Sequence, residues 1–374
     1  MGQLNSTPRI VLTGGPCAGK TTALNYLREA LLDIGYYPIM VPEAATLLNQ
    51  CGINPNGGIF NMLSFEKLVI EQMLAFEQLV QSALHHAAHK KPVVIYDRGL
   101  MDIKAYVDNT AFEALQEQYG IDTVDMRDKS YTAIFHLRTA ALGAEDFYTQ
   151  INNHARVETL EEARLLDERT LEAWIGHSHL SIIDNSTDFS GKLRRLFGGV
   201  CAVLGVPSPL EIERKFLVNN FNRSQFALVG INVSEVEIEQ FYIIPPPDEK
   251  KDVVVRFRKR TQYGSSIYWK TQKEHIESGT NIEIESEVSP DEYEWSKAYK
   301  NPSTVFITKN RLCFVYKNQY FELDVFDGTN KGLSILEIEL LARDQEVSLP
   351  PFLYIGDEVT DDKNFSNRAL AQIR

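Results

Sequence analysis

Near its start the chain reads Gly14-Gly15-Pro16-Cys17-Ala18-Gly19-Lys20-Thr21, which satisfies the spacing GxxxxGK[ST]. An apolar stretch, Arg9–Thr13, precedes it, and a helical pattern over Thr21–Asp33 follows it. Glycines let backbone N–H groups point around a phosphate, and the following helix directs the positive end of its dipole at the anion. In such a loop Lys20 reaches the β- and γ-phosphates, while the Thr21 hydroxyl ligates Mg²⁺. The stretch therefore predicts a cradle for a nucleoside triphosphate with Mg²⁺.

The rest of the first ~205 residues alternates short apolar segments with long helical patterns, which is typical of a parallel sheet covered by helices. Further strands are expected at Pro38–Pro42, Val93–Asp97, Thr132–Leu137 and Leu180–Asp184. Helices are expected at Ser64–His89, Glu158–Gly176 and Gly191–Leu204. Together with the phosphate loop (residues 14–21), this pattern predicts an α/β P-loop NTPase fold with a kinase-type parallel sheet.

Two acidic residues follow strands of this predicted sheet. Asp97 ends Val93–Asp97, where a carboxylate can hold the Mg²⁺ water shell or take a proton from an acceptor hydroxyl. Glu43 ends the second strand and faces the same edge, because the carboxyl ends of parallel strands form the binding crevice. The alternatives are a helix cap for Asp97 and an exposed loop position for Glu43. Both residues are candidates for catalysis.

Length and composition narrow the class of protein. The 374 residues exceed what one core usually supports, so we expect two domains. The net charge of −13 disfavours nonspecific binding to nucleic acid. The four cysteines are scattered without zinc spacing, and no apolar run reaches the length that a bilayer requires. These features predict a cytoplasmic protein with reduced thiols and no transmembrane segment.

The texture of the sequence changes after Gly205-Val206-Pro207-Ser208-Pro209, a cluster of chain-breaking residues. We therefore expect two domains, residues 1–206 and residues 207–374. Beyond the boundary, strands of period two dominate, and one helical insert is expected at Pro290–Tyr299.

Several strands of the second half carry charges of one sign on one face. Alternation places Glu211, Glu213 and Lys215 on the face opposite Ile212 and Phe216. The same device recurs in Arg256-Phe257-Arg258, Lys309-Asn310-Arg311, Glu322-Leu323-Asp324 and Glu337-Ile338-Glu339. These faces could be the solvated outside of an ordinary barrel. Inside a closed barrel, acidic strands would bind divalent metal and basic strands a polyanion. Either these ligands or opposite charges across the lumen would compensate the cost of desolvation. The sorting by sign favours the interior.

Residues 9–205 resemble the P-loop family that joins nicotinamide riboside kinases to the TRPL translocation defect proteins. The resemblance lies in Gly14–Thr22, Asp97-Arg98-Gly99, His136-Leu137-Arg138 and Ile183-Asp184-Asn185. It implies a nucleotide held by Gly14, Gly15, Gly19, Lys20, Thr21 and Thr22, a basic lid with Arg138 and Arg156, and Asn185 near the base. Since no guanine-reading NKxD motif is present, ATP and GTP both stay open.

Residues 208–374 resemble the CYTH, or triphosphate tunnel metalloenzyme, family, whose ExExK motif corresponds to Glu211, Glu213 and Lys215. The resemblance implies an α+β domain with an antiparallel eight-stranded tunnel barrel that hydrolyses a triphosphate with Mg²⁺ or Mn²⁺. The implied phosphate-binding and catalytic residues are Lys215, Arg256, Arg258, Lys270, Lys309 and Arg311. The implied metal ligands are Glu211, Glu213, Glu283, Glu285, Asp324, Glu337 and Glu339, beside Thr21 and Asp97 in the first domain.

Two functions are consistent with this domain order. The first is an enzyme, with an NTP-dependent kinase or NTPase domain and a triphosphatase domain that acts on a phosphorylated small molecule. The second is a GTP- and phosphoinositide-binding regulator of membrane-protein trafficking, peripheral at membranes, whose tunnel reads a phosphate headgroup. The complete set of tunnel carboxylates favours the enzyme, because carboxylates serve metal-dependent chemistry.

Overall fold

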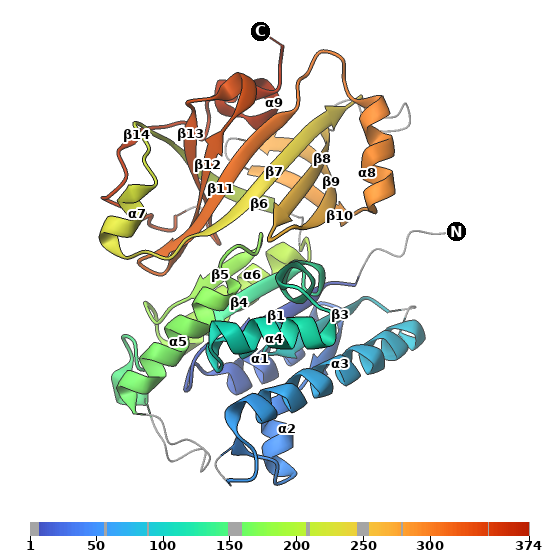
Figure 1. Ribbon diagram of the computed structural model, residues 1–374, viewed down its shortest axis with the longest axis vertical. Helices are drawn as coiled ribbons and strands as arrows, with labels where there is room; N and C mark the ends of the chain where they lie inside the picture. Colours follow the sequence, from blue (N-terminus) through green and yellow to red (C-terminus); the bar gives the residue numbers. More distant parts are fainter. Residues whose placement is uncertain are drawn as a thin grey trace. The chain divides into compact units, whose positions relative to one another are not determined.

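The computed structural model describes residues 7–55, 58–87, 90–148, 159–206, 210–244, 254–277, 280–342 and 344–373. The chain divides into two compact units, Met1–Val200 and Cys201–Arg374 (Figure 1). The predicted boundary between residues 206 and 207 adjoins residues 207–209, which lie outside the described part, so its position stays a prediction. Among the described residues, no helix combines the length and apolar character that a membrane span needs.

The first unit is built on a five-stranded sheet in the order β2-β3-β1-β4-β5, and every pair of neighbours is parallel. Its strands are β1 (Arg9–Thr13), β2 (Tyr37–Val41), β3 (Pro92–Asp97), β4 (Ala133–Leu137) and β5 (Leu180–Ile183). The central strand β1 is apolar because helices cover both faces of the sheet, and Ile10, Val11 and Leu12 are fully buried. The predicted parallel sheet is confirmed, with every strand within one residue of its expected ends.

The helices of this unit are α1 (Lys20–Asp33), α2 (Ala44–Gln50), α3 (Met62–His86), α4 (Asn109–Tyr119), α5 (Leu160–Trp174) and α6 (Phe189–Val203). The unit also contains three short helical segments among the described residues, η2 (Leu100–Ala105), η3 (Asp125–Lys129) and η4 (Glu145–Phe147). Thr159 and Glu162 form a capping box at the start of α5, which fixes where that helix begins. The four expected helices are present, whereas α2 and α4 were not predicted. Figure 1 shows these elements in blue to green.

The second unit is a ring of antiparallel strands. Its strands are β6 (Leu210–Val218), β7 (Ser234–Ile243), β8 (Val254–Gln262), β9 (Ser265–Glu277), β10 (Thr280–Glu287), β11 (Ile307–Tyr316), β12 (Gln319–Phe326), β13 (Ser334–Glu339) and β14 (Ile355–Glu358). Eight of them run in the order β10-β9-β8-β7-β11-β12-β13-β6, and β10 pairs with β6 to close the ring. The short β14 pairs with the other half of β6. The predicted eight-stranded barrel is thus present, with a ninth strand added.

Short helices accompany the ring: α7 (Ser224–Val229), α8 (Pro290–Ser296), α9 (Asn367–Leu370), η5 (Lys297–Tyr299), η6 (Gly328–Asn330) and η7 (Lys363–Phe365). The expected insert Pro290–Tyr299 is α8 with η5. Figure 1 shows α8 beside β8 and β9, which it contacts.

The apolar core of the second unit lies outside the ring. Phe216, Phe314 and Leu336 belong to a cluster that includes Phe226 of α7, and Phe241 and Phe257 pack against Tyr293 of α8. The strands β6, β7, β8, β11 and β13 therefore turn their apolar faces toward covering segments. Because side chains alternate along a strand, the charged faces lie on the inside.

One stretch of the interior is apolar as well. Tyr242, Ile307, Phe326 and Ile335 cluster with Leu370 of α9. Ile335 lies directly opposite the tunnel residue Asp324 on the neighbouring strand, so it points into the ring. Ile307 lies opposite Gln240 and two positions before Lys309, so it points into the ring as well. The C-terminal helix thus packs into one end of the ring. The charged part of the interior, which we call the tunnel, extends from this apolar end.

Candidate functional site

The phosphate loop joins β1 to α1 and is held tightly against β4. Gly14 has a φ of 135°, and a Cβ atom there would lie 2.0 Å from the carbonyl oxygen of Leu137. Only glycine fits this position, both sterically and in its backbone conformation. The Lys20 Nζ donates to the carbonyl oxygens of Gly14 at 2.9 Å and Gly15 at 3.2 Å, so the ammonium lies across the loop. Burial and the nearby Arg98 lower the pKa of Lys20, while Asp97 opposes them.

A cavity of about 1840 Å³ opens above the loop. Gly19, Lys20, Thr21 and Thr22 line it, together with the predicted Glu43, Asp97 and Asn185. A pocket for one small molecule typically measures roughly 300–1,000 Å³, so this cavity has room for a nucleotide and a second molecule. The structure thus brings most of the predicted residues of the first domain to one space.

Glu43 and Asp97 differ strongly in their surroundings. The Arg98 Nε donates to Glu43 Oε1 at 2.5 Å. Burial would raise the pKa of Glu43, but Arg98 and Lys20 outweigh it and hold that pKa at about 2. For Asp97 burial dominates and raises the pKa to about 6. Arg98 adopts a φ of 70°, a strained conformation for a non-glycine residue that aims its side chain at Glu43.

A third carboxyl, Glu66 of α3, also lines this cavity. It is 4 % exposed, and no hydrogen bond to it is found among the described residues. Burial, with Asp102 and Glu43 nearby, raises the pKa of Glu66 to about 8, although Arg98 opposes the shift. Sequence reasoning missed Glu66, because a glutamate in an amphipathic helix is indistinguishable from a surface residue until the helix is placed.

Asn185 lies between the loop after β4 and helix α6. Its Nδ2 donates to the carbonyl oxygens of Thr139 and Leu142, both at 2.8 Å, and its Oδ1 accepts from Lys192 Nζ at 2.7 Å. The buried Lys192 also donates to the carbonyl oxygens of Ala18 at 3.2 Å and Arg138 at 2.6 Å. Lys192 was not predicted, and it joins the phosphate loop to β4 and α6.

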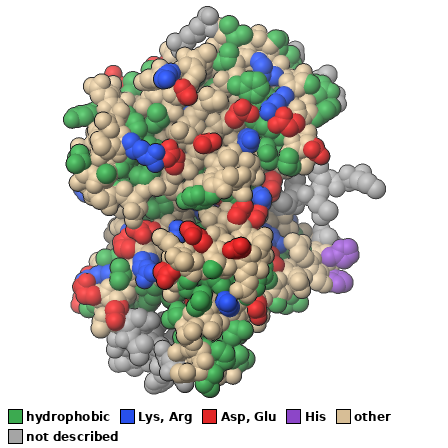
Figure 2. Space-filling model, viewed as in Figure 1, with side chains coloured by type: hydrophobic (Ala, Val, Ile, Leu, Met, Phe, Trp, Pro, Cys, Tyr) green, Lys and Arg blue, Asp and Glu red, His purple; other side chains and the backbone are tan. Residues whose placement is uncertain are grey.

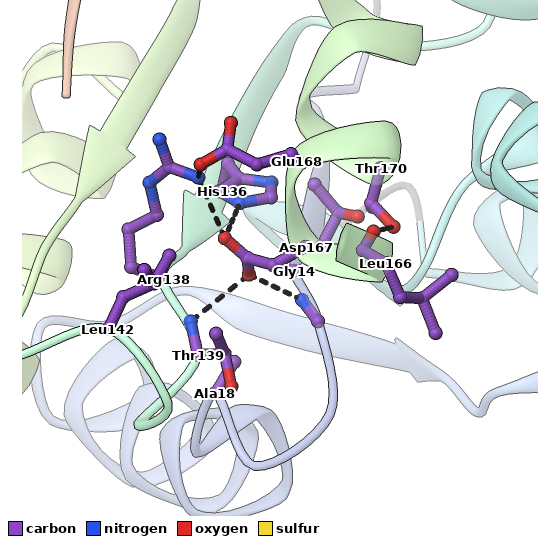
Figure 3. Close-up of polar contacts among 12 residues, drawn as sticks. Gly14, Ala18, His136, Arg138, Thr139, Leu142, Leu166, Asp167, Glu168 and Thr170 are labelled. Carbon is purple, nitrogen blue, oxygen red and sulfur yellow. Dashed lines mark hydrogen bonds and ion pairs between the residues drawn. The ribbon is translucent and has the colours of Figure 1, made fainter. Parts of the chain in front are cut away.

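Arg138, the predicted lid residue, is buried and pairs with Asp167 and Glu168 of α5, each at 2.8 Å (Figure 3). It is not among the cavity-lining residues of the described part. The structure therefore places Arg138 against α5 below the loop rather than over the phosphates. Arg156, the other lid candidate, lies outside the described residues.

Most of the predicted tunnel residues whose side chains the structure describes share the inner face of the ring. Register pairs Arg256 with Thr271, Arg311 with Asp324, and Glu337 with both Lys215 and Glu322. Asp324 is fully buried, and Lys215, Arg256, Lys309 and Arg311 are each less than one-tenth exposed. By contrast, Figure 2 shows acidic and basic side chains interspersed over the visible surface. Within the described part of the ring, β8 and β11 place basic side chains on the tunnel face, and β12 and β13 place acidic ones there.

The most buried part of this network centres on Arg311. Its guanidinium donates to both oxygens of Asp324, at 2.7 and 2.6 Å, to Glu337 at 2.8 Å and to Glu322. Lys309 pairs with the same Asp324. Lys215 Nζ lies 3.1 Å from Glu213 and 3.2 Å from Glu337, which lowers the pKa of Glu337 despite its burial.

A second group lies across the tunnel on β8, β9 and β10. Arg256 and Arg258 lie 3.4 and 3.9 Å from one Glu285 oxygen, and Thr271 Oγ1 donates to the same oxygen at 2.7 Å. Lys273 lies 3.9 Å from Glu213 and so connects the two groups.

The prediction for Lys270 needs correction. Its Cα partner on β8 is Phe257, a residue of the outer core, whereas Thr271 and Lys273 share the face of Arg256. Alternation therefore places Lys270 on the outside of the ring, and Lys273 supplies the inner cation of β9. Glu339 is exposed at the end of β13. The side chains of Glu211 and Glu283 lie outside the described part.

The tunnel carboxylates are oxygen ligands of the kind that Mg²⁺ and Mn²⁺ prefer, so the donor chemistry fits a divalent metal. Among the described residues, however, no group of three or more His, Cys, Asp and Glu side chains is arranged to hold an ion. Glu213, Glu285, Asp324 and Glu337 are each within 4 Å of a Lys or Arg nitrogen instead. Ligation by these groups therefore requires that their cationic partners turn elsewhere.

A phosphate cradle on a parallel sheet and a closed ring with an ionic interior together define a P-loop domain joined to a tunnel domain. Residues 9–192 match the family described as AAA domain, and residues 209–347 match the CYTH domain. An inorganic triphosphatase of Nitrosomonas europaea is 32% identical over 164 residues, which are 43% of this chain and 96% of that protein. The chain belongs to the CYTH domain family.

Solved structures show the same likeness over part of the chain. A crystal structure of an inorganic triphosphatase is 30% identical, with a TM-score of 0.32, over 44% of this chain and 95% of its own. A protein from Pyrococcus horikoshii OT3 is 24% identical, with a TM-score of 0.28, over 36% of this chain and 80% of its own.

Proposed function

We propose that the tunnel binds an inorganic triphosphate or a related phosphoanhydride together with Mg²⁺ or Mn²⁺ and hydrolyses it. The observation that carries the proposal is the buried, sign-sorted network around Arg311, since so many charges inside a ring suit a polyanion with a divalent cation. The relation to a protein named inorganic triphosphatase supports it.

In this proposal Lys215, Arg256, Arg258, Lys309 and Arg311 bind phosphate oxygens and neutralise the charge that develops on the leaving phosphate. Lys273 joins them from β9, in the place expected for Lys270. The ion pairs already formed keep these cations charged, so phosphate oxygens can replace carboxylates as their partners.

The carboxylates that those phosphate oxygens displace are then available as metal ligands. Glu213, Glu285, Asp324 and Glu337 are the proposed ligands, with Glu211, Glu283 and Glu339 kept as predictions. A divalent ion held there would supply charge neutralisation and lower the pKa of a bound water.

We further propose that the P-loop domain binds an NTP with Mg²⁺ and transfers its γ-phosphoryl group to a hydroxyl of a small molecule or to water. The size of the cavity supports two bound molecules. Lys20 would bind the phosphates and Thr21 the metal. This domain would be kinase-like in the manner of the family joining nicotinamide riboside kinases and TRPL translocation defect proteins.

Asp97 is the proposed general base, since a pKa of about 6 leaves it ionised at neutral pH yet basic enough to accept a proton. Glu43 is less suited to that role, because its pKa of about 2 makes it a weak base. We assign Glu43 to orienting the acceptor with Arg98. The ionised carboxylates of Glu43 and Asp97 favour an acceptor that carries no phosphate, because like charges repel.

The test is a phosphate-release assay on the full chain with ATP, GTP, tripolyphosphate and pyrophosphate, each with Mg²⁺, with Mn²⁺ and with a chelator. Glu213→Ala should abolish metal-dependent release from tripolyphosphate and leave NTP binding intact. Lys20→Ala should abolish NTP binding and leave metal-dependent release from tripolyphosphate intact. Tripolyphosphate hydrolysis that survives Glu213→Ala, or that needs no metal, contradicts the tunnel proposal.

The same samples distinguish the regulatory alternative. Tight binding to phosphoinositide vesicles with preference for GTP and negligible turnover of every substrate would replace the enzymatic proposal with a headgroup-reading tunnel. Vesicles of phosphatidylcholine alone serve as the control, since they carry neither a phosphoinositide headgroup nor a net surface charge.

A further inference from the structure

Asp167 of α5 is fully buried directly beneath the phosphate loop. Its Oδ1 accepts from the backbone N–H of Gly15 at 2.8 Å and of Thr139 at 3.0 Å. Its Oδ2 accepts from Arg138 Nη1 at 2.8 Å and lies 3.3 Å from His136 Nε2. Figure 3 shows the carboxylate between these groups, with both oxygens engaged. One side chain thus ties the loop, the end of β4 and helix α5 together.

The packing at this point is as close as the hydrogen bonding. A Cβ atom on Gly15 would lie 2.7 Å from Asp167 Cβ and 3.0 Å from its Cα, so the loop touches the helix backbone. Thr139 also donates through Oγ1 to the carbonyl oxygen of Pro16, and the Ala140 N–H donates to that of Cys17 at 3.2 Å. The segment after β4 therefore contacts the loop directly, and Asp167 accepts hydrogen bonds from both the loop and that segment.

Helix α5 also reaches the cavity. Leu166, beside Asp167 in sequence, lines the cavity wall, and Arg164 Nε donates to the carbonyl oxygen of Ala141 at 2.7 Å. Arg164 pairs with Glu145 on the cavity rim at 3.2 Å.

We propose that Asp167 is the positioning residue that fixes the phosphate loop in the shape that binds nucleotide, by holding the Gly15 and Thr139 N–H groups on one carboxylate oxygen. This rests on the proposed function of the loop as a nucleotide cradle. Arg138 and His136 orient the carboxylate through its other oxygen, which explains why Arg138 lies below the loop. Asp167 does not touch the nucleotide and is not a catalytic residue.

Two substitutions separate positioning from mere stability. Asp167→Asn keeps an oxygen for the two N–H groups but places an amide NH₂ against the donors of Arg138. Asp167→Ala removes both oxygens. We expect both variants to unfold at lower temperature than the wild type. Only Asp167→Ala should raise the Kd for Mg-ATP and Mg-GTP, roughly tenfold, as the loss of hydrogen bonds to a charged group implies.

The measurements are calorimetric nucleotide binding, the melting temperature, and KM against kcat for NTP turnover. Glu168→Gln is the matched control, because Glu168 pairs with the same Arg138 but is half exposed, and its Kd should stay at the wild-type value. Wild-type affinity in a folded Asp167→Ala overturns the proposal. So does an Asp167→Asn variant that has lost as much affinity as Asp167→Ala, since affinity would then merely follow stability.

If Asp167→Ala does not fold, Asp167→Asn decides alone, through hydrogen exchange of the loop amides. Retained protection of the amides of residues 14, 15 and 17–19 with retained affinity supports the proposal, and lost protection with retained affinity overturns it. Lys20→Ala, made without any change at Asp167, distinguishes failure of the nucleotide cradle from failure of the role proposed for Asp167. If that variant binds nucleotide as well as the unaltered protein, the cradle itself, and not the role of Asp167, is wrong.

Discussion

Arg311 and Asp324 form a two-pronged ion pair inside the ring, with Nε 2.7 Å from Oδ1 and Nη2 2.6 Å from Oδ2. Asp324 is fully buried, and the Arg311 side chain is 10% exposed. The same guanidinium also serves Glu337 at 2.8 Å. Arg311 is therefore the residue on which the charge balance of the tunnel depends.

Arg311→Met should destabilise the second unit strongly, because it leaves Asp324 and its neighbours short of a buried cation. Breaking a buried pair from one side costs about 3–5 kcal/mol, and Lys309, which remains, should place the loss at the lower end. Urea denaturation followed by circular dichroism gives the free energy of unfolding.

The control for this substitution is Arg214→Met. Arg214 is also two-pronged, to Glu358 at 2.8 and 2.6 Å, but both side chains are more than a third exposed. A surface pair contributes at most about 1 kcal/mol. Equal losses of unfolding free energy in the two variants would show that the Arg311 ion pairs contribute no more to stability than a surface pair.

Lys273 and Lys270 test the face of β9 on which cations serve the tunnel. Lys273→Ala should lower kcat/KM for tripolyphosphate by about tenfold or more, since it removes positive charge near Glu213. Lys270→Ala should leave kcat/KM within about twofold, because surface substitutions away from a site have small effects. A reversed order would mean that the tunnel face of β9 has been assigned wrongly.

The sequence predicts the parts of this molecule that depend on local pattern. Apolar runs alternating with helices give the parallel sheet, and the glycine spacing places the phosphate loop between Arg9–Thr13 and α1. The sorting of charges by strand predicts the ring interior, because a face with charges of one sign needs a counter-charge from another strand. Each of these follows from residues close together in sequence.

What depends on distant segments could not be predicted in this way. Lys270 and Lys273 lie on opposite faces of one strand, and only the register with β8 shows which faces inward. Asp167 and Glu66 occupy helices where acidic residues are usually solvated, and both lie against residues more than twenty positions away in the chain. The pairing of Arg138 with Asp167 and Glu168 of α5 could not be predicted for the same reason.

Glu66 should make the stability of the first unit depend on pH. Its pKa is raised from an ordinary 4.5 to about 8 by burial, so its contribution is fully present below pH 4.5 and is lost as pH rises through 8. Glu66→Gln removes the titrating group. Relative to the wild type, we expect this variant to gain roughly 2–4 kcal/mol between pH 5 and pH 8.5, since each unit of pKa shift is worth about 1.4 kcal/mol.

Melting temperatures of both proteins across that pH range provide the measurement. Glu113→Gln, an exposed position on α4, is the control and should follow the wild type at every pH. A pH-independent difference between Glu66→Gln and the wild type would mean that Glu66 is ionised in the folded protein.

Lys192→Met should weaken nucleotide binding as well as stability. The Lys192 ammonium has three donors, and the carbonyl oxygens of Ala18 and Arg138 and the Asn185 amide oxygen accept all three. Methionine keeps an unbranched side chain, one heavy atom shorter, but leaves three buried acceptors without that donor, at about 1 kcal/mol each. Because Ala18 belongs to the phosphate loop, we expect the Kd for Mg-ATP to rise about tenfold, an effect equivalent to 1.4 kcal/mol.

Arg194→Met on the same helix is exposed and should change neither quantity. The comparison shows whether the hydrogen bonds of the Lys192 ammonium matter, or whether any substitution on α6 has the same effect. If Lys192→Met lowers the melting temperature without changing the Kd, the ammonium stabilises α6 alone. The loop would then owe its shape to β4 and α5, and the Gly15 and Thr139 contacts would suffice to preserve the cradle.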